Sequence, residues 1–162
     1  MKKILTLVCV MLMGIGFAQA QVHQGETAAG VNLVYGSEIK SMGIGARFQY
    51  GILDQLRAEV GFNYFFEHDR KTWWDVNINA HYLFGVWNEK LYLYPIAGLN
   101  YTMKTEKDES EVSDEDNHVG LNLGAGIEYE ITEHFGVNFE YRHTIVRKVD
   151  QGVFGLGLNY KF

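Results

Sequence analysis

Seven charged residues stand at alternating positions that would place their side chains on one face of a β-sheet. They are Arg47, Arg57, Glu59, Asp75, Glu128, Glu140 and Arg142. Apolar residues flank most of them, as in Leu56-Arg57-Ala58-Glu59-Val60, and a period of two is that of a strand. If this face is enclosed, the charges must pair, because an unpaired buried charge costs several kcal/mol. The pattern therefore predicts a polar network of ion pairs, and the alternative is a gated polar path for water or small ions.

Nucleophilic chemistry would require a serine beside a histidine and an acid. The serines Ser37, Ser41, Ser110 and Ser113 fall in predicted loops, and no serine–histidine pair stands out on neighbouring strands. His68 and His118 lack a second ligand at a suggestive spacing. The sequence therefore predicts no enzyme activity, no metal and no cofactor.

Strands must position the charged face, and the sequence contains eight segments with the alternating pattern. These are Glu26–Tyr35, Met42–Tyr50, Leu56–Phe66, Trp73–Phe84, Leu91–Met103, Val119–Tyr129, Phe135–Ile145 and Gly152–Phe162. The fifth segment is the least regular, because Tyr92, Tyr94 and Ile96 fall on the parity opposite to Leu93. Pro95 predicts a bulge or a missing ladder bond there.

The connections between these segments alternate in length and charge. Short turns are predicted at 51–54, 85–90 and 131–134, and charged loops at 67–72, 104–117 and 146–151. The stretch 104–117 is strongly acidic and lacks the residue order of a calcium loop, so we expect a mobile loop there. An even number of strands with short turns at one end is typical of membrane barrels. We therefore predict an all-β, eight-stranded antiparallel up-and-down transmembrane β-barrel.

The first twenty residues have the composition of a secretory signal peptide. Lys2 and Lys3 precede the apolar run 4–17, and Ala18-Gln19-Ala20 forms a small-residue cleavage site. This predicts removal of residues 1–20 and a barrel domain over 21–162. The only cysteine, Cys9, would leave with the signal, so no disulfide is expected. Without Lys2 and Lys3, 12 basic residues face 20 acidic ones, and the formal charge of −8 argues against nucleic acid as a partner.

The composition of the two strand faces indicates which one points outward. The face opposite the apolar one is rich in Gly and Asn and carries charges of both signs, which suits a narrow lumen better than a solvent surface. Aromatic residues gather near the strand ends, as membrane girdles do. They include Tyr35, Tyr50, Tyr64, Phe66, Trp73, Trp74, Phe84, Tyr101, Tyr129, Phe135 and Tyr160. We therefore expect the apolar face to contact lipid, and the alternative is a soluble lipocalin-like barrel with this face inside.

The chain resembles the OmpA/OmpX-like outer-membrane β-barrel family, also described as the outer membrane protein beta-barrel or porin-family domain. The resemblance rests on the eight alternating strands, the segment GILDQLRAEVGFNY at 51–64 and the terminal YKF at 160–162. It implies a monomer in the outer membrane of a Gram-negative bacterium, surrounded by lipid and lipopolysaccharide. It also implies that Tyr160 and Phe162 carry the C-terminal signal that the barrel-assembly machinery reads during insertion.

Basic residues near the predicted outer rim are candidates for contacts with lipopolysaccharide phosphates. They are Arg70, Lys71, Lys104, Lys107, Arg147 and Lys148. The expected role is structural: the protein stabilises the envelope or displays surface loops, and its lumen is filled by side chains. The alternatives are a small-solute channel and an outer-membrane enzyme that modifies lipid A.

Overall fold

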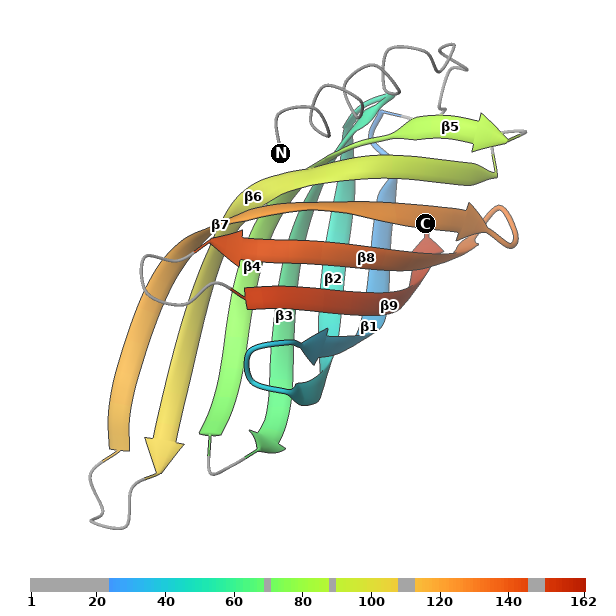
Figure 1. The fold of residues 1–162 in the computed structure, drawn as a ribbon. Coiled ribbons are helices and arrows are strands. Elements are labelled where there is room, and N and C mark those ends of the chain that lie inside the picture. Colours follow the sequence, from blue (N-terminus) through green and yellow to red (C-terminus); the bar gives the residue numbers. More distant parts are fainter. Residues whose placement is uncertain (1–23, 69–70, 88–89, 108–112, 146–150) are drawn as a thin grey trace, which may run out of the picture.

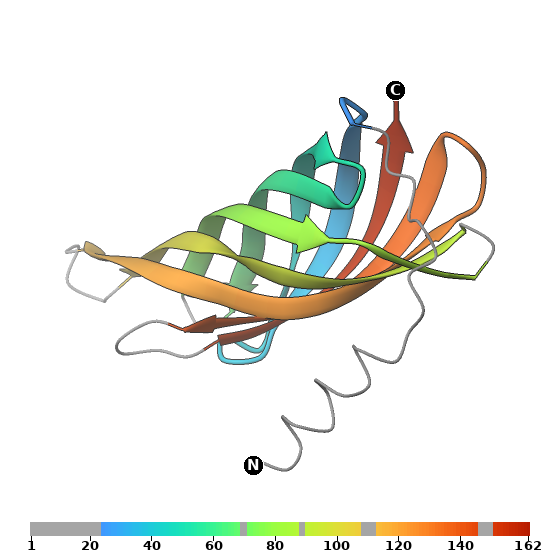
Figure 2. The ribbon, with the colours of Figure 1, turned by 90° about the horizontal axis from the view of Figure 1, so that it is seen from above.

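The computed structural model describes residues 24–68, 71–87, 90–107, 113–145 and 151–162, which form one closed antiparallel β-barrel. The strands are β1 (Thr27–Gly36), β2 (Ser41–Leu53), β3 (Leu56–His68), β4 (Lys71–Tyr82), β5 (Phe84–Trp87), β6 (Leu91–Lys107), β7 (Ser113–Glu130), β8 (Phe135–Ile145) and β9 (Gln151–Lys161). Each strand pairs with the next in sequence except β4, which pairs with β6 as β5 does, and β9 pairs with β1 to close the barrel. Figures 1 and 2 show these strands curving round to form the wall of a barrel. β4 and β5 follow one another along the same edge of β6 and together count as one strand of the barrel. The predicted eight-stranded up-and-down barrel is therefore confirmed.

The predicted signal peptide, residues 1–20, lies outside the described residues. Within the part of the chain that the structure describes, no helix is long and apolar enough to cross a membrane.

The apolar parity of the strands faces outward, as predicted. Val31, Leu33 and Phe48 expose 63%, 52% and 50% of their surface, whereas their neighbours Asn32 and Arg47 are buried inside. Because successive side chains of a strand point to opposite faces, one register fixes this orientation for a whole strand. The barrel therefore presents an apolar outer surface and a polar interior, which is the arrangement of a barrel embedded in lipid.

The prediction of a mobile loop at 104–117 was wrong at both of its ends. β6 continues to Lys107 and β7 begins at Ser113, in register from Leu91↔Tyr129 to Lys107↔Ser113. The remaining residues, 108–112, lie outside the described part. The error arose because ladder hydrogen bonds join backbone groups, so a hairpin above the membrane can form without apolar side chains. In Figure 1 this hairpin runs past the ends of β8 and β9.

Several shorter connections were also predicted too long. Glu67 and His68 belong to β3, Lys71 and Thr72 to β4, and β2 continues through Leu53. The predicted turn at 131–134 is confirmed as a bend between β7 and β8. Residues 69–70, 88–89 and 146–150 lie outside the described residues.

Pro95 interrupts the ladder without changing its register. β4 pairs with β6 as far as His81↔Ile96, and β5 resumes in the same register at Phe84↔Leu93. The gap lies opposite Pro95, which has no N–H to donate. This is the predicted missing ladder bond. Gly85, expected in a turn, lies in β5, and a bulge follows between Gly85 and Trp87.

Apolar side chains inside the barrel form a cluster near each end of the lumen. Leu83, Tyr92, Tyr94 and Ile96 form the inner cluster, near the short turns. Val34, Phe65, Trp73 and Val153, with Ile39 packed against them, form the outer cluster, near the long hairpins. Trp73 is therefore buried in the lumen and is not part of the lipid-facing girdle predicted for it. The other ten girdle aromatics do lie on the outward parity.

Candidate functional site

The charged side chains of the lumen meet around Arg47 on β2. Its Nη1 lies 2.6 Å from Oε1 of Glu140 on β8 and 3.3 Å from Oε2 of Glu59 on β3. Gln49 donates to the same Glu59 oxygen at 2.9 Å. One buried arginine therefore joins strands on opposite sides of the barrel.

A second ion pair lies nearer the inner end. Nη1 of Arg57 on β3 contacts both carboxylate oxygens of Glu128 on β7, at 3.2 and 3.0 Å. Asn159 on β9 donates to Glu128 at 3.2 Å. All three residues are buried. Together they connect β3, β7 and β9 across the lumen.

Asp75 and Arg142 occupy the outer half of the lumen and are held differently. Asp75 accepts hydrogen bonds from Asn63 at 2.7 Å and Asn77 at 2.5 Å. Arg142 is 94% buried, since only 6% of its surface is exposed. It acts on Asp75, Glu59 and Glu140 through electrostatic attraction. No ion pair of Arg142 within 4.0 Å is found among the described residues, so its charge is balanced at longer range than that of Arg47.

Asparagine amides connect the charged groups into one continuous network. Oδ1 of Asn77 accepts from Asn100 at 2.9 Å and from Asn122 at 2.8 Å. Asn122 also donates to Asn79 at 2.9 Å, and Asn79 donates to Glu59 at 3.2 Å. The Asn-rich inner face therefore supplies both donors and acceptors, which buried polar groups require.

Tyr94 and His81 belong to this network, and the sequence did not single them out. The Tyr94 hydroxyl donates to Oε1 of Glu140 at 2.8 Å. The Tyr94 ring stacks on the His81 ring, with 4.9 Å between the ring centres. The Arg57 guanidinium lies 5.2 Å from the centre of the Tyr94 ring. The available signal was the parity break at Tyr92, Tyr94 and Ile96, which marks side chains that turn into the lumen.

Glu59, His81 and Glu140 bring three ligand atoms within 4.8 Å of one another, a spacing that could hold a metal ion. However, Oε1 of Glu140 already accepts hydrogen bonds from Arg47, Tyr94 and Asn138. A cation at this point would have to displace these donors and sit beside two guanidinium groups. The chemistry of this cluster is therefore that of a buried ion-pair network.

The serines do not assemble a nucleophilic site in the described residues. Ser41, at the start of β2, donates to the carbonyl oxygen of Phe66 at 2.6 Å. Ser37 accepts from the backbone N–H of Gly152 at 3.1 Å. Ser113 begins β7, and Ser110 lies outside the described part. The prediction that all four serines lie in loops was wrong for Ser41 and Ser113.

The remaining candidate residues that the structure describes lie at the two ends of the barrel. Lys104 on β6 places Nζ 4.1 Å from the centre of the Trp73 ring. Lys71 and Lys107 belong to β4 and β6, whereas Arg70, Arg147 and Lys148 lie outside the described residues. At the inner end, the Tyr160 and Phe162 rings meet edge to face at 5.2 Å, and Phe162 is 71% exposed.

An apolar outer wall, a polar filled lumen and hairpins that extend at one end define an integral outer-membrane β-barrel protein. Residues 5–162 match the model of the outer membrane protein beta-barrel domain, and the chain belongs to that family. It is thus an OmpA/OmpX-like barrel of the Gram-negative outer membrane.

Individual relatives agree with this assignment. Outer membrane protein X of Escherichia coli K12 is 21% identical over 148 residues, which cover 91% of this chain and 82% of that protein. The uncharacterized outer-membrane protein y4mB of Sinorhizobium fredii is 31% identical over 86 residues, or 41% of this chain and 38% of that protein. The N-terminal β-barrel domain of Pseudomonas aeruginosa OprF superposes with a TM-score of 0.75 at 21% identity, covering 86% and 98% of the two chains. The likeness to OprF shows the shared fold.

Proposed function

We propose that this protein is a non-enzymatic outer-membrane barrel that displays an acidic β-hairpin outside the cell. The carrying observation is the unequal reach of the strands. β6 and β7 stay paired out to Lys107↔Ser113, whereas the described pairing of β7 with β8 stops at Leu121↔Ile145. The eight residues from Ser113 to Gly120 correspond to roughly 25 Å of strand. The hairpin therefore extends beyond the described end of β8, while β4 accompanies β6 as far as Lys71↔Glu106.

The charge of this hairpin favours a cationic partner. The segment 104–117 contains seven acidic residues and two basic ones. Opposite charges attract over about 8–10 Å at physiological salt, so a basic surface would be drawn to the hairpin. Lys71 and the other basic rim residues would contact lipopolysaccharide phosphates, whereas Lys104 lies over the Trp73 ring. The same barrel would also stabilise the envelope as a rigid membrane body.

The filled lumen supports this role over the channel alternative. Apolar clusters stand near both ends, and the buried ion pairs of Arg47 and Arg57 lie between them. An eight-stranded barrel is only wide enough for side chains to fill it. A steady pore would require these groups to separate.

The test compares the whole protein with a variant in which an Asn-Gly turn replaces residues 104–117. Proteoliposomes of the whole protein should bind immobilised polylysine and release it in 0.5 M salt, and the variant should not bind. Both proteins should keep the gel shift on heating that reports a folded barrel. Equal polylysine binding by the two proteins would contradict the proposal.

A planar-bilayer recording tests the channel alternative. The expected result is no steady conductance. A conductance that changes on Glu59→Gln or Arg142→Gln substitution would establish the channel function instead.

A further inference from the structure

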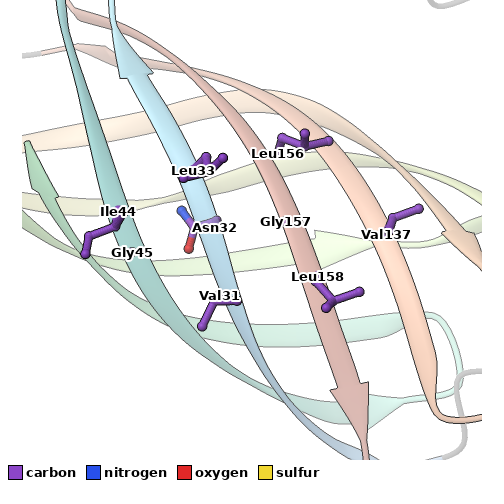
Figure 3. Close-up of a pocket in the computed structure, with 9 residues that line it drawn as sticks. All are labelled: Val31, Asn32, Leu33, Ile44, Gly45, Val137, Leu156, Gly157 and Leu158. Carbon is purple, nitrogen blue, oxygen red and sulfur yellow. The ribbon is translucent and has the colours of Figure 1, made fainter.

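A groove crosses the outer wall of the barrel where β2, β1, β9 and β8 lie side by side (Figure 3). Its volume is about 510 Å³. Two rows of aliphatic side chains form its walls: Ile44, Leu33 and Leu156 in one row, Val31, Leu158 and Val137 in the other. Its floor is the backbone of Gly45, Asn32 and Gly157, which pair in register between the rows. The groove is therefore almost wholly apolar.

The groove lies midway along the strands, at the depth of the hydrocarbon core. On its outer side Tyr35 pairs with Phe154, and on its inner side Phe135 pairs with Tyr160. Such aromatic pairs mark the two interfaces of a membrane barrel. An occupant at this depth must be apolar, because a polar group there would lack hydrogen-bond partners.

The shape of the groove suits a flexible chain better than a second barrel. Its two rows follow the ladder direction, which is perpendicular to the strands. Since strands of membrane barrels tilt by about 35–45°, the groove is also inclined to the membrane normal. An acyl chain that enters from one leaflet can lie along it, whereas the convex wall of a second copy would touch only its rim.

Charge at the inner end indicates which lipid supplies the chain. Asp54 in the β2–β3 turn and Glu133 in the β7–β8 turn are exposed, and Asp54 accepts one hydrogen bond from the backbone N–H of Gln24. Lys161 at this end of β9 is bound to Glu26 and Glu130, and neither Lys nor Arg occurs in the described turn residues 54–55 and 131–134. Carboxylates attract an ammonium headgroup and repel an anionic one.

We infer that the groove binds one acyl chain of an ammonium-headed phospholipid from the leaflet on the short-turn side. Half of the hydrocarbon core is about 15 Å thick, so a chain anchored at this interface reaches the middle of the barrel. The headgroup then lies at the inner ends of β1 and β9, between Asp54 after β2 and Glu133 before β8, while Leu33, Val31 and Leu158 contact the chain. This binding site is separate from the displayed hairpin and from the lumen.

Native mass spectrometry of the purified whole protein tests the inference, with equimolar phosphatidylethanolamine and phosphatidylglycerol added in detergent. Val31→Trp fills the groove, and Val60→Trp places the same side chain on the exposed outer face of β3. Val31→Trp should lower retention of phosphatidylethanolamine about tenfold, and Val60→Trp should leave it unchanged. The gel shift on heating confirms that each variant is folded.

A second variant separates the headgroup from the chain. Asp54→Asn combined with Glu133→Gln should keep one bound lipid and lose the preference for phosphatidylethanolamine. Equal lipid retention by Val31→Trp and Val60→Trp would overturn the inference, because the bound lipid would then be ordinary boundary lipid. Dimers of the unmodified protein that disappear in Val31→Trp would also overturn it, because the occupant would be a second copy.

Discussion

Tyr94 on β6 donates its hydroxyl hydrogen to Glu140 on β8, 2.8 Å away, across the whole width of β7. The residue between them is Gly126, which pairs with Tyr94 on one side and with Glu140 on the other. A Cβ atom at Gly126 would meet the Tyr94 ring. Because Gly126 has no side chain, the Tyr94 ring can lie across the inner face of β7 and reach Glu140.

The first prediction concerns this close approach. Gly126→Ala should lower the free energy of unfolding by about 1–3 kcal/mol, because the added methyl group overpacks against the ring. Gly136→Ala is the matched control, since its Cβ would meet atoms only at 3.6 Å, an ordinary contact. Denaturant unfolding in lipid vesicles measures both. Adding Tyr94→Ala should remove the extra cost of Gly126→Ala, and two additive effects would contradict the crowding argument.

The second prediction isolates the Tyr94 hydroxyl. Tyr94→Phe keeps the ring stacked on His81 and removes the donor to Glu140. The free energy of unfolding should fall by about 1.5–3 kcal/mol, the contribution of a hydrogen bond to a charged group. Tyr129→Phe on the exposed outer face should change it by much less. An equal loss in both variants would show that the lumen hydrogen bond contributes nothing particular.

The third prediction concerns the ion pairs of Arg47. Arg47→Met leaves Glu59 and Glu140 buried without their nearest cation, and should cost about 3–5 kcal/mol. Combining it with Glu140→Gln should cost less than the sum of the two single changes, because the partner charge is then absent as well. A double-mutant cycle on unfolding free energies measures this coupling, and zero coupling would count against the ion-pair network.

The fourth prediction concerns the closure of the barrel. Lys161 on β9 binds Glu26, just before β1, at 3.1 Å and also binds Glu130 on β7. Lys161→Met should keep the aliphatic stem and lower the free energy of unfolding by about 1 kcal/mol, since these pairs are only partly buried. Refolding into vesicles and the temperature of the gel shift test this. Lys40→Met, in the exposed β1–β2 turn, should leave both unchanged.

The fold was largely predictable because strand parity is a local property. Leu156, Leu158 and Tyr160 alternate with Gly157 and Asn159, and this period survives in β9. The lumen charges were predictable for the same reason, since Arg57 and Glu59 share one parity. The extended β6–β7 hairpin was not predictable from its acidic composition, because its stability comes from backbone pairing.

The sequence by itself determined the strand number, the up-and-down order and the parity that faces lipid, because each of these follows from period-two patterning and turn positions. Only the tertiary structure decided which lumen groups meet. Barrel closure and the stagger between strands bring Arg47 to Glu140, 93 positions away in the chain, and turn Tyr94 and His81 against each other. Those contacts depend on the register of all the strands of the barrel together, which no single strand encodes.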